Sequence, residues 1–278
     1  MNVYELTYPG VFLEHQDRAW ANEARTMLSL MEGAFSDATV AVNLFEIEYQ
    51  QMATADSKRR DEITKRRAEV KAHLEKHLRP PDDPRLARIE QIAKELDALP
   101  KFEGVDRIEL RAYHATKIYN RERREAGERP EEFRAIPLRI YARAFIHALH
   151  VFEKALRVLV EDARGQSALA DILKEFNAHF PGFRGVRDTL EHVDERIRRL
   201  ARKKEVIPQP IDNGAIKSGL GNVLIIEGLY GTSFQCTTAE GELGSVDVSL
   251  SSLQRLQEVL QSVINAFAWH GPRRPYPN

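Results

Sequence analysis

A long helical pattern near the N-terminus constrains the fold more than any other feature of this chain. Between Asp17 and Leu78, Gly33 is the single glycine or proline. Apolar residues recur there at spacings of three and four, which places one face of a helix in a core. These residues are Ala24, Met27, Leu28, Met31, Phe35, Ala38 and Val42. The second half of the span carries mixed charges and few apolar positions, which is typical of a helix exposed on most sides.

A change of composition divides the chain into two predicted regions. Residues 1–128 are expected to form a helical arm or hairpin, because their charged helices have narrow apolar seams. Residues 129–278 open with IPLRIYARAFIHALHVFEKALRVLVEDA, the most apolar helical pattern of the chain, which predicts the centre of a helical bundle. A small β-meander is predicted at about 222–249, and Ser249 or Ser251 is expected to cap the final helix. The predicted fold class is therefore mainly α.

Composition limits the classes of function. The 278 residues have a formal net charge of −1, so a nucleic-acid site would have to be a local basic patch. Cys236 is the single cysteine, which excludes a disulfide framework and favours a reducing compartment. The N-terminus lacks a signal-peptide pattern, and no apolar run approaches the roughly 20 residues of a membrane helix. We therefore expect a cytoplasmic protein without a membrane segment.

The polar stretch FPGFRGVRDTLEHVDERIRR, from Phe180 to Arg199, bears most on function. As one helix it would place its apolar residues in a stripe less than about 100° wide. That stripe consists of Val186, Leu190, Val193, Ile197 and Leu200. Arg187 lies about 100° from the stripe centre, Asp188 about 200° and His192 about 240°. All three are therefore expected to point away from the core, with Asp188 and His192 sharing a face.

Two interpretations of these side chains stay open. Arg187 and Glu191, Asp188 and His192, and His192 and Arg196 are each four residues apart. Pairs of this kind build ordinary solvated helix faces and stabilise a helix by about 0.2–0.5 kcal/mol each. The other interpretation takes Arg187, Asp188 and His192 together as a catalytic site.

The segment RDTLEH, from Arg187 to His192, resembles the motif of the HEPN superfamily. That motif is an arginine, a polar residue, three variable residues and a histidine. The family consists of small helical bundles, many of them metal-independent ribonucleases of toxin, antiphage and RNA-processing systems. The resemblance covers roughly residues 130–270 in its organisation. A looser form of the motif also fits Arg143 to His150, but Asp188 supplies the expected polar residue and His150 lies in the most apolar helix.

The resemblance implies a metal-independent endoribonuclease that needs no cofactor. The 2′-OH of RNA would attack the phosphate and leave a 2′,3′-cyclic phosphate and a 5′-OH. A histidine such as His192 can exchange the proton near neutral pH, and Arg187 can hold the phosphate by two hydrogen bonds. Asp188 would orient the His192 ring.

The resemblance also implies a homodimer, and we expect its interface to include the helix from Arg187 to Arg199. Candidate RNA-binding residues near the motif are Arg184, Arg198, Arg199 and Arg202. Their simpler interpretation is a solvated helix end, because basic side chains favour the negative end of the helix dipole.

Two further hypotheses remain open. In one, the protein is a non-catalytic, dimerising scaffold whose charged arm binds nucleic acid or a partner protein, such as an antitoxin. In the other, it is a metal-dependent bundle enzyme, which would require His147, His150 and Glu153 to meet further carboxylates. One observation distinguishes the scaffold from the ribonuclease. In the ribonuclease, Arg187 and His192 converge in an accessible cleft.

Overall fold

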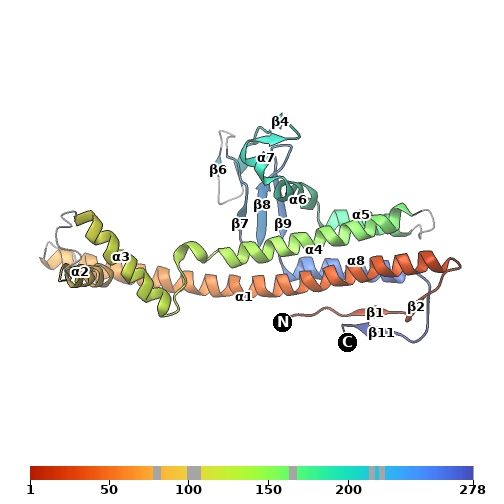
Figure 1. Ribbon diagram of the computed structural model, residues 1–278, viewed down its shortest axis with the longest axis horizontal. Coiled ribbons are helices and arrows are strands. Elements are labelled where there is room, and N and C mark those ends of the chain that lie inside the picture. Colours follow the sequence, from red (N-terminus) through yellow and green to blue (C-terminus); the bar gives the residue numbers. More distant parts are fainter. Residues whose placement is uncertain (78–82, 99–107, 163–167, 213–216, 219–222, 278) are drawn as a thin grey trace. The chain divides into compact units, whose positions relative to one another are not determined.

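The computed structural model describes residues 1–77, 83–98, 108–162, 168–212, 217–218 and 223–277. Its helices are α1 (Arg18–His77), α2 (Pro84–Asp97), α3 (Ile108–Glu125), the 3-10 helix η2 (Glu131–Phe133), α4 (Ile136–Glu161), α5 (Ala168–His179), α6 (Phe183–Glu191), α7 (Val193–Ile197) and α8 (Leu250–Asn265). The predicted class is confirmed, because the fold is mainly α with small antiparallel strands near the C-terminus (Figure 1).

The strands are short and pair in antiparallel fashion. They are β1 (Leu6–Tyr8), β2 (Phe12–Leu13), β3 (Leu200–Ala201), β4 (Lys204–Glu205), β5 (Ile211–Asp212), β6 (Lys217–Ser218), β7 (Gly228–Tyr230), β8 (Ser233–Thr237), β9 (Leu243–Asp247), β10 (Trp269–His270) and β11 (Arg274–Tyr276). Strands β7, β8 and β9 form the predicted meander. Asn222, the first residue of its predicted range, lies outside the described residues.

Two compact units make up the chain, and their boundary differs from the predicted one after residue 128. The first unit joins Met1–Glu48 to Pro137–Asn278, and the second is Tyr49–Ile136. Helix α1 belongs to both, because it continues without a break past Glu48. The physical reason for the difference is burial. The first half of α1 buries a full apolar face, whereas the predicted arm assigned that half to an exposed region.

Aromatic side chains hold the helices of the first unit together. The ring of Phe152 on α4 stacks on Phe176 of α5, with 5.6 Å between centroids. Phe176 in turn meets Phe183 of α6 edge to face at 6.0 Å. Helix α8 packs beside α5, and its start is capped by Ser249, whose Oγ accepts a hydrogen bond from the Ser252 amide. The predicted cap at Ser249 is therefore confirmed.

Helix α6 lies against strands β8 and β9, and this contact positions the motif. Gly182 begins the helix, and a Cβ atom at this position would lie 2.3 Å from the carbonyl oxygen of Ser245 on β9. Only glycine allows so close an approach of backbone to backbone. Cys236 on β8 is fully buried nearby.

The two ends of the chain pair with each other, which the sequence did not predict. Strand β1 pairs with β11, and β2 pairs with β10. The Tyr8 hydroxyl donates to the buried Glu32 of α1, and the Arg274 guanidinium lies 4.3 Å from the centre of the Tyr8 ring. These contacts fasten the paired ends to the first half of α1.

The second unit has a smaller core between α2 and α3, centred on Ile92, Leu96 and Ala115. Helix α3 ends at a left-handed glycine, Gly127, with φ of 84°. The amide of Glu128 donates to the carbonyl oxygen of Arg123, which completes a glycine-type helix cap. Within the ranges given above, no helix combines the length and the apolar character needed to cross a membrane.

Candidate functional site

The RDTLEH motif lies on a shorter helix than the single continuous helix that the sequence predicted. Helix α6 ends at Glu191, and His192 has non-helical φ and ψ of −121° and 40° before α7 begins. The predicted continuous helix through Leu200 is therefore wrong. After the break Arg196 is buried, and its guanidinium donates to the Leu200 carbonyl oxygen at 2.6 Å. Ile197, expected in the core stripe, is 63% exposed.

Arg187 on α6 turns toward α4 instead of toward open solvent. Its Nη1 donates to Oε2 of Glu153 at 3.2 Å and lies 3.3 Å from Nδ1 of His150. Its Nε and Nη2 donate to Oδ1 of Asp188 at 2.9 and 2.5 Å. The guanidinium also lies over the Phe183 ring, 5.8 Å from its centre. The arginine is thus held in one orientation by contacts from two helices.

Glu153 is the centre of this network and is 1% exposed. Its Oε1 accepts from Arg157 at 2.9 and 3.1 Å and from Nε of Arg184 at 2.8 Å. A buried carboxylate needs such partners, because leaving water without them would cost several kcal/mol. Arg184, a predicted RNA-binding residue, therefore directs its charge at Glu153, and it also donates to Asn177 at 3.0 Å.

His150 occupies the other side of Arg187 and is 8% exposed. Since an arginine only donates, Nδ1 of His150 must accept, and the proton sits on Nε2. That Nε2 lies 3.2 Å from Oε1 of Glu191. Burial, and then the charge of Lys154, lower the pKa of His150 below its ordinary value. We infer a neutral ring with both nitrogens occupied, which suits positioning of Arg187 better than proton exchange with a ligand.

Asp188 and His192 do not interact as expected. The Asp188 carboxylate contacts Arg187, and its link to His192 is a backbone hydrogen bond of 3.1 Å from the His192 amide to the Asp188 carbonyl oxygen. Asp188 therefore orients the arginine and not the histidine ring. The His192 side chain is exposed, and among the described residues no hydrogen bond reaches its ring.

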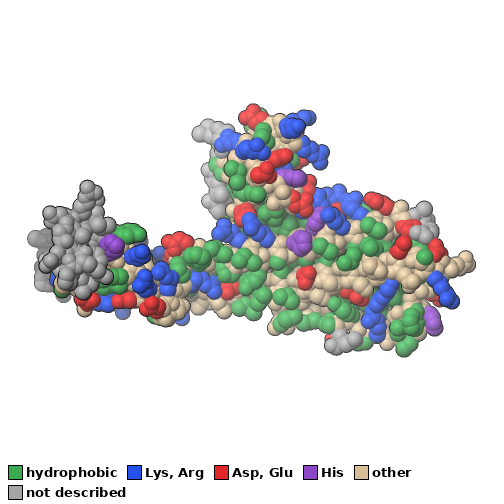
Figure 2. Space-filling view, in the orientation of Figure 1, with side chains coloured by type: hydrophobic (Ala, Val, Ile, Leu, Met, Phe, Trp, Pro, Cys, Tyr) green, Lys and Arg blue, Asp and Glu red, His purple; other side chains and the backbone are tan. Residues whose placement is uncertain are grey.

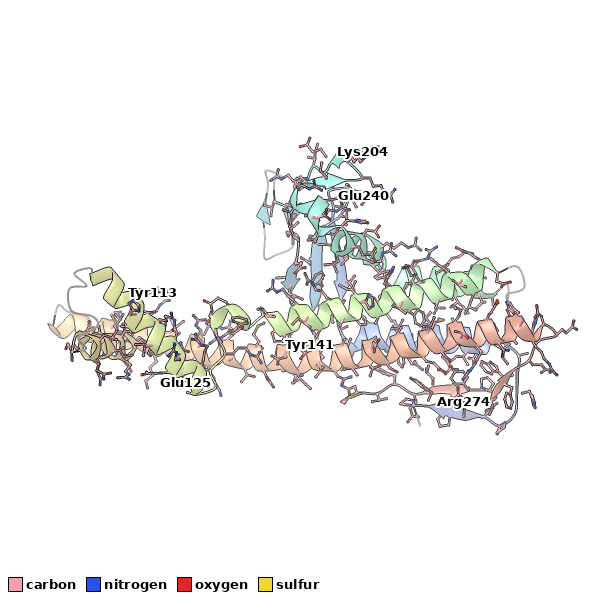
Figure 3. The ribbon with its side chains drawn as sticks, in the orientation of Figure 1. Tyr113, Glu125, Tyr141, Lys204, Glu240 and Arg274 are labelled. Carbon is pink, nitrogen blue, oxygen red and sulfur yellow. The ribbon has the colours of Figure 1, made fainter. Side chains whose placement is uncertain are left out.

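The remaining predicted RNA-binding residues lie after α7, in an exposed basic segment. Arg198 pairs with Asp194 at 3.5 Å. Arg199 and Arg202 adopt left-handed backbone conformations, with φ of 56° and 48°. Lys204 marks the start of β4 in this segment (Figure 3). These side chains are exposed, so the segment offers positive charge beside α6 and α7.

The metal-site alternative finds no support in the geometry of the described residues. Among them, no group of three or more His, Cys, Asp or Glu side chains is placed to hold a metal ion. His147 is exposed on α4, whereas the carboxylate of Glu153 is turned toward three arginines. His150 lies between one of those arginines and the carboxylate of Glu191.

Figure 2 shows histidine, basic and acidic side chains gathered over α4 and the α6–α7 segment. Comparison with protein-family models, with curated proteins and with solved structures returned no significant match to this chain. The HEPN resemblance therefore depends on the RDTLEH motif and its helical setting. The contact of Arg187 with His150 and Glu153 was not predicted from the sequence, which had named those two residues together only as candidate metal ligands.

Proposed function

We propose that this protein is a metal-independent endoribonuclease of HEPN type. The observation that carries the proposal is the fixed orientation of Arg187 between the buried Glu153 and the neutral His150, with an exposed His192 at the end of the same helix. Arg187 would contact the scissile phosphate and His192 would exchange the proton. Glu153 and His150 are positioning residues, because they act through Arg187.

The chemistry needs no group beyond these side chains and the RNA itself. The 2′-OH gives up its proton and its oxygen bonds to phosphorus, while the bond from phosphorus to the 5′-oxygen breaks. The products are a 2′,3′-cyclic phosphate and a 5′-OH. A planar guanidinium that stays charged stabilises the phosphorane-like transition state, and an imidazole exchanges protons near neutral pH. The exposed ring of His192 can reach a bound substrate, whereas both nitrogens of His150 are occupied.

Incubation with structured and single-stranded RNA in the presence of a chelator tests this proposal. Wild-type protein should cleave, and His192→Ala should reduce the rate by about 100-fold or more. Arg187→Lys should also be impaired, because a lysine cannot reproduce the planar grip. His147→Ala is the matched control, since His147 is exposed on α4 outside the network. Wild-type rates in His192→Ala would overturn the proposal.

A non-catalytic scaffold is the second candidate, and one observation favours it. The charge of Arg187 is already met by Glu153 and Asp188, which weakens its attraction for a phosphate. In this reading the network serves only to join α4 to α6. Failure of the wild-type protein to cleave any RNA, with or without divalent metal, would support the scaffold.

We also propose that either function is carried by a homodimer, with a second copy as the partner. The expected interface from Arg187 to Arg199 exposes Ile197 as a large apolar side chain. Helices α1 and α4 of the first unit expose more, namely Val40, Leu44, Ile47, Ile140 and Val158. Apolar surface of this kind is typical of protein interfaces. Light scattering should therefore give twice the chain mass, and Leu44→Glu should shift it toward one chain.

A further inference from the structure

A cleft of about 1120 Å³ lies within the second unit. Its walls come from the second half of α1, from α2 and α3, and from the segment that contains η2. Tyr113 and Glu125, labelled in Figure 3, mark the course of α3. Pockets for small molecules usually enclose about 300–1,000 Å³. A cleft beyond that range suits a stretch of a polymer better than a small metabolite.

The cleft is basic, although the whole chain is not. Seven lysine and arginine side chains line it, against four glutamates. Lys58 on α1, Arg85 on α2 and Arg124 on α3 are exposed, and none of them has an ion pair within the described parts of the chain. Three uncompensated charges from three helices therefore face one cleft. Such an arrangement attracts a ligand that carries several negative charges.

The other charges in the cleft build its wall. Glu131 of η2 pairs with Arg59 of α1 at 2.6 Å and with Arg134 at 3.3 Å. Arg123 pairs with Glu128 and lies 5.8 Å from the centre of the Tyr119 ring. These ion pairs hold the η2 segment against α1 and α3. The paired arginines are thus distinguished from Lys58, Arg85 and Arg124, which remain for a ligand.

An aromatic side chain completes the site. Phe133 on η2 lines the cleft and is 55% exposed, so its ring is accessible to a ligand. Basic side chains along a groove, combined with an exposed aromatic ring, are the usual means of binding single-stranded nucleic acid. The cations pair with phosphates and the ring stacks on an unpaired base. In a duplex the bases are stacked inside and cannot reach such a ring.

We propose that this cleft binds single-stranded nucleic acid, with Lys58, Arg85 and Arg124 pairing with phosphates and Phe133 stacking on a base. The site is separate from the catalysis proposed at Arg187, because its residues all belong to the second unit. It therefore stands or falls independently of the ribonuclease proposal.

Fluorescence anisotropy on the full chain carrying His192→Ala tests the site without cleavage of the probe. The probes are a labelled single-stranded RNA about 12 nucleotides long, the DNA of the same sequence, the RNA duplex and a polyglutamate peptide. Binding of the single strands should weaken about tenfold in Phe133→Ala, because stacking is lost. In Arg124→Ala it should weaken as well, and the slope of log affinity against log salt should fall by about 0.7.

Arg67→Ala is the matched control, because Arg67 is exposed on the same unit but does not line the cleft. It should leave affinity nearly unchanged. Three results would each overturn the proposal. They are the absence of binding to single strands at low salt, equal loss of binding in Arg67→Ala and Arg124→Ala, and a preference for the duplex or the acidic peptide over the single strands.

Discussion

At the scale of single residues, Gly182 is the position where a methyl group should be least tolerated. Its φ and ψ of −85° and −9° suit any residue, so the cost of Gly182→Ala is steric. The new Cβ would meet the backbone of β9, which cannot move aside cheaply. We expect the free energy of unfolding to fall by about 2–3 kcal/mol, as for other overpacked sites, in a urea titration.

Gly33→Ala is the control for that experiment. A Cβ atom at Gly33 would have nothing within 4 Å, and the residue lies inside α1. Because alanine favours the helix, this change should raise the free energy of unfolding by about 1 kcal/mol. Equal effects of the two substitutions would contradict the close approach of α6 to β9.

His150 should make stability depend on pH. Its pKa is lowered in the fold by burial and by the charge of Lys154, with Arg187 also lowering it and Glu191 and Glu153 opposing. The unfolded chain therefore takes up the proton first as pH falls. Stability is fully present above the ordinary histidine pKa of about 6.5 and is lost as pH falls through that value toward the lower pKa of the folded protein.

The change His150→Gln should flatten that loss, measured by urea titrations across the same pH range. Gln keeps a donor for Glu191 but does not titrate. His192→Gln is the control, since the His192 ring is exposed and should contribute little. A pH profile of His150→Gln that matches the wild type would show that protonation of His150 does not disturb the network.

The network around Arg187 shows why residue patterns alone could not predict the site. The sequence placed Arg187, Asp188 and His192 away from the core, but the Arg187 guanidinium meets the buried Glu153, and His192 is the exposed one of the three. It could not show that Arg187 meets His150, 37 positions away in the chain, because that contact depends on how α4 and α6 pack. A four-residue spacing favoured contact between Asp188 and His192. Asp188 instead pairs with the guanidinium of the adjacent Arg187, which attracts its carboxylate more strongly.

At the scale of elements, periodic patterns predicted the long helices well. They predicted helix ends poorly where no proline or glycine marks the end. Helix α1 spans Arg18–His77 and α4 spans Ile136–Glu161, close to the apolar and charged runs that predicted them. The end of α6 at Glu191 has no proline or glycine to announce it. After this end, the Arg196 side chain contacts Thr189 and Leu200, seven and four residues away, which a regular helical pattern does not predict.

The β3–β4 hairpin gives a prediction at this scale. Arg202 and Lys203 form its two-residue turn with φ of 48° and 68°, the conformation for which Asn-Gly is preferred. Replacing the pair by Asn-Gly should raise the free energy of unfolding by about 1 kcal/mol, visible as a higher melting temperature. Arg202 is also a candidate RNA-binding residue. If this pair of side chains binds RNA, the Asn-Gly variant should bind RNA more weakly.

Arg198→Asn separates charge from conformation in that test. Arg198 has a right-handed φ of −83°, so losing its charge should weaken RNA binding without stabilising the turn. A lower melting temperature in the Asn-Gly variant would contradict the claim that the backbone of Arg202 and Lys203 is strained.

At the scale of the whole molecule, composition predicted a helical chain with two regions, and the predicted boundary differs from that of the two compact units. The charged segment after Tyr49 is a separate unit, as its sparse apolar positions suggested. The first half of α1 is not part of it, because residues such as Leu28 and Phe35 belong to the core of the first unit. Pairing of the two chain ends through β1 and β11 joins segments too far apart for sequence patterns to connect.

The division into units predicts that the first unit folds alone. Deleting Tyr49–Ile136 and joining the flanking residues through a Gly-Ser linker of roughly ten residues should preserve a cooperative unfolding transition. The chain's two tryptophans, Trp20 and Trp269, both belong to the first unit and report on it by fluorescence. Trp20 is buried 6.1 Å from Phe267, so its emission should shift when this core opens.

The same deletion separates the two proposals made for this protein. It removes Lys58, Arg85, Arg124 and Phe133, so binding of single strands at the cleft should be lost. The deletion keeps Arg187 and its network. The shortened protein should therefore still cleave RNA when the RNA concentration is high. A gradual change of tryptophan fluorescence, without a cooperative transition, would show instead that the first unit needs the second to fold.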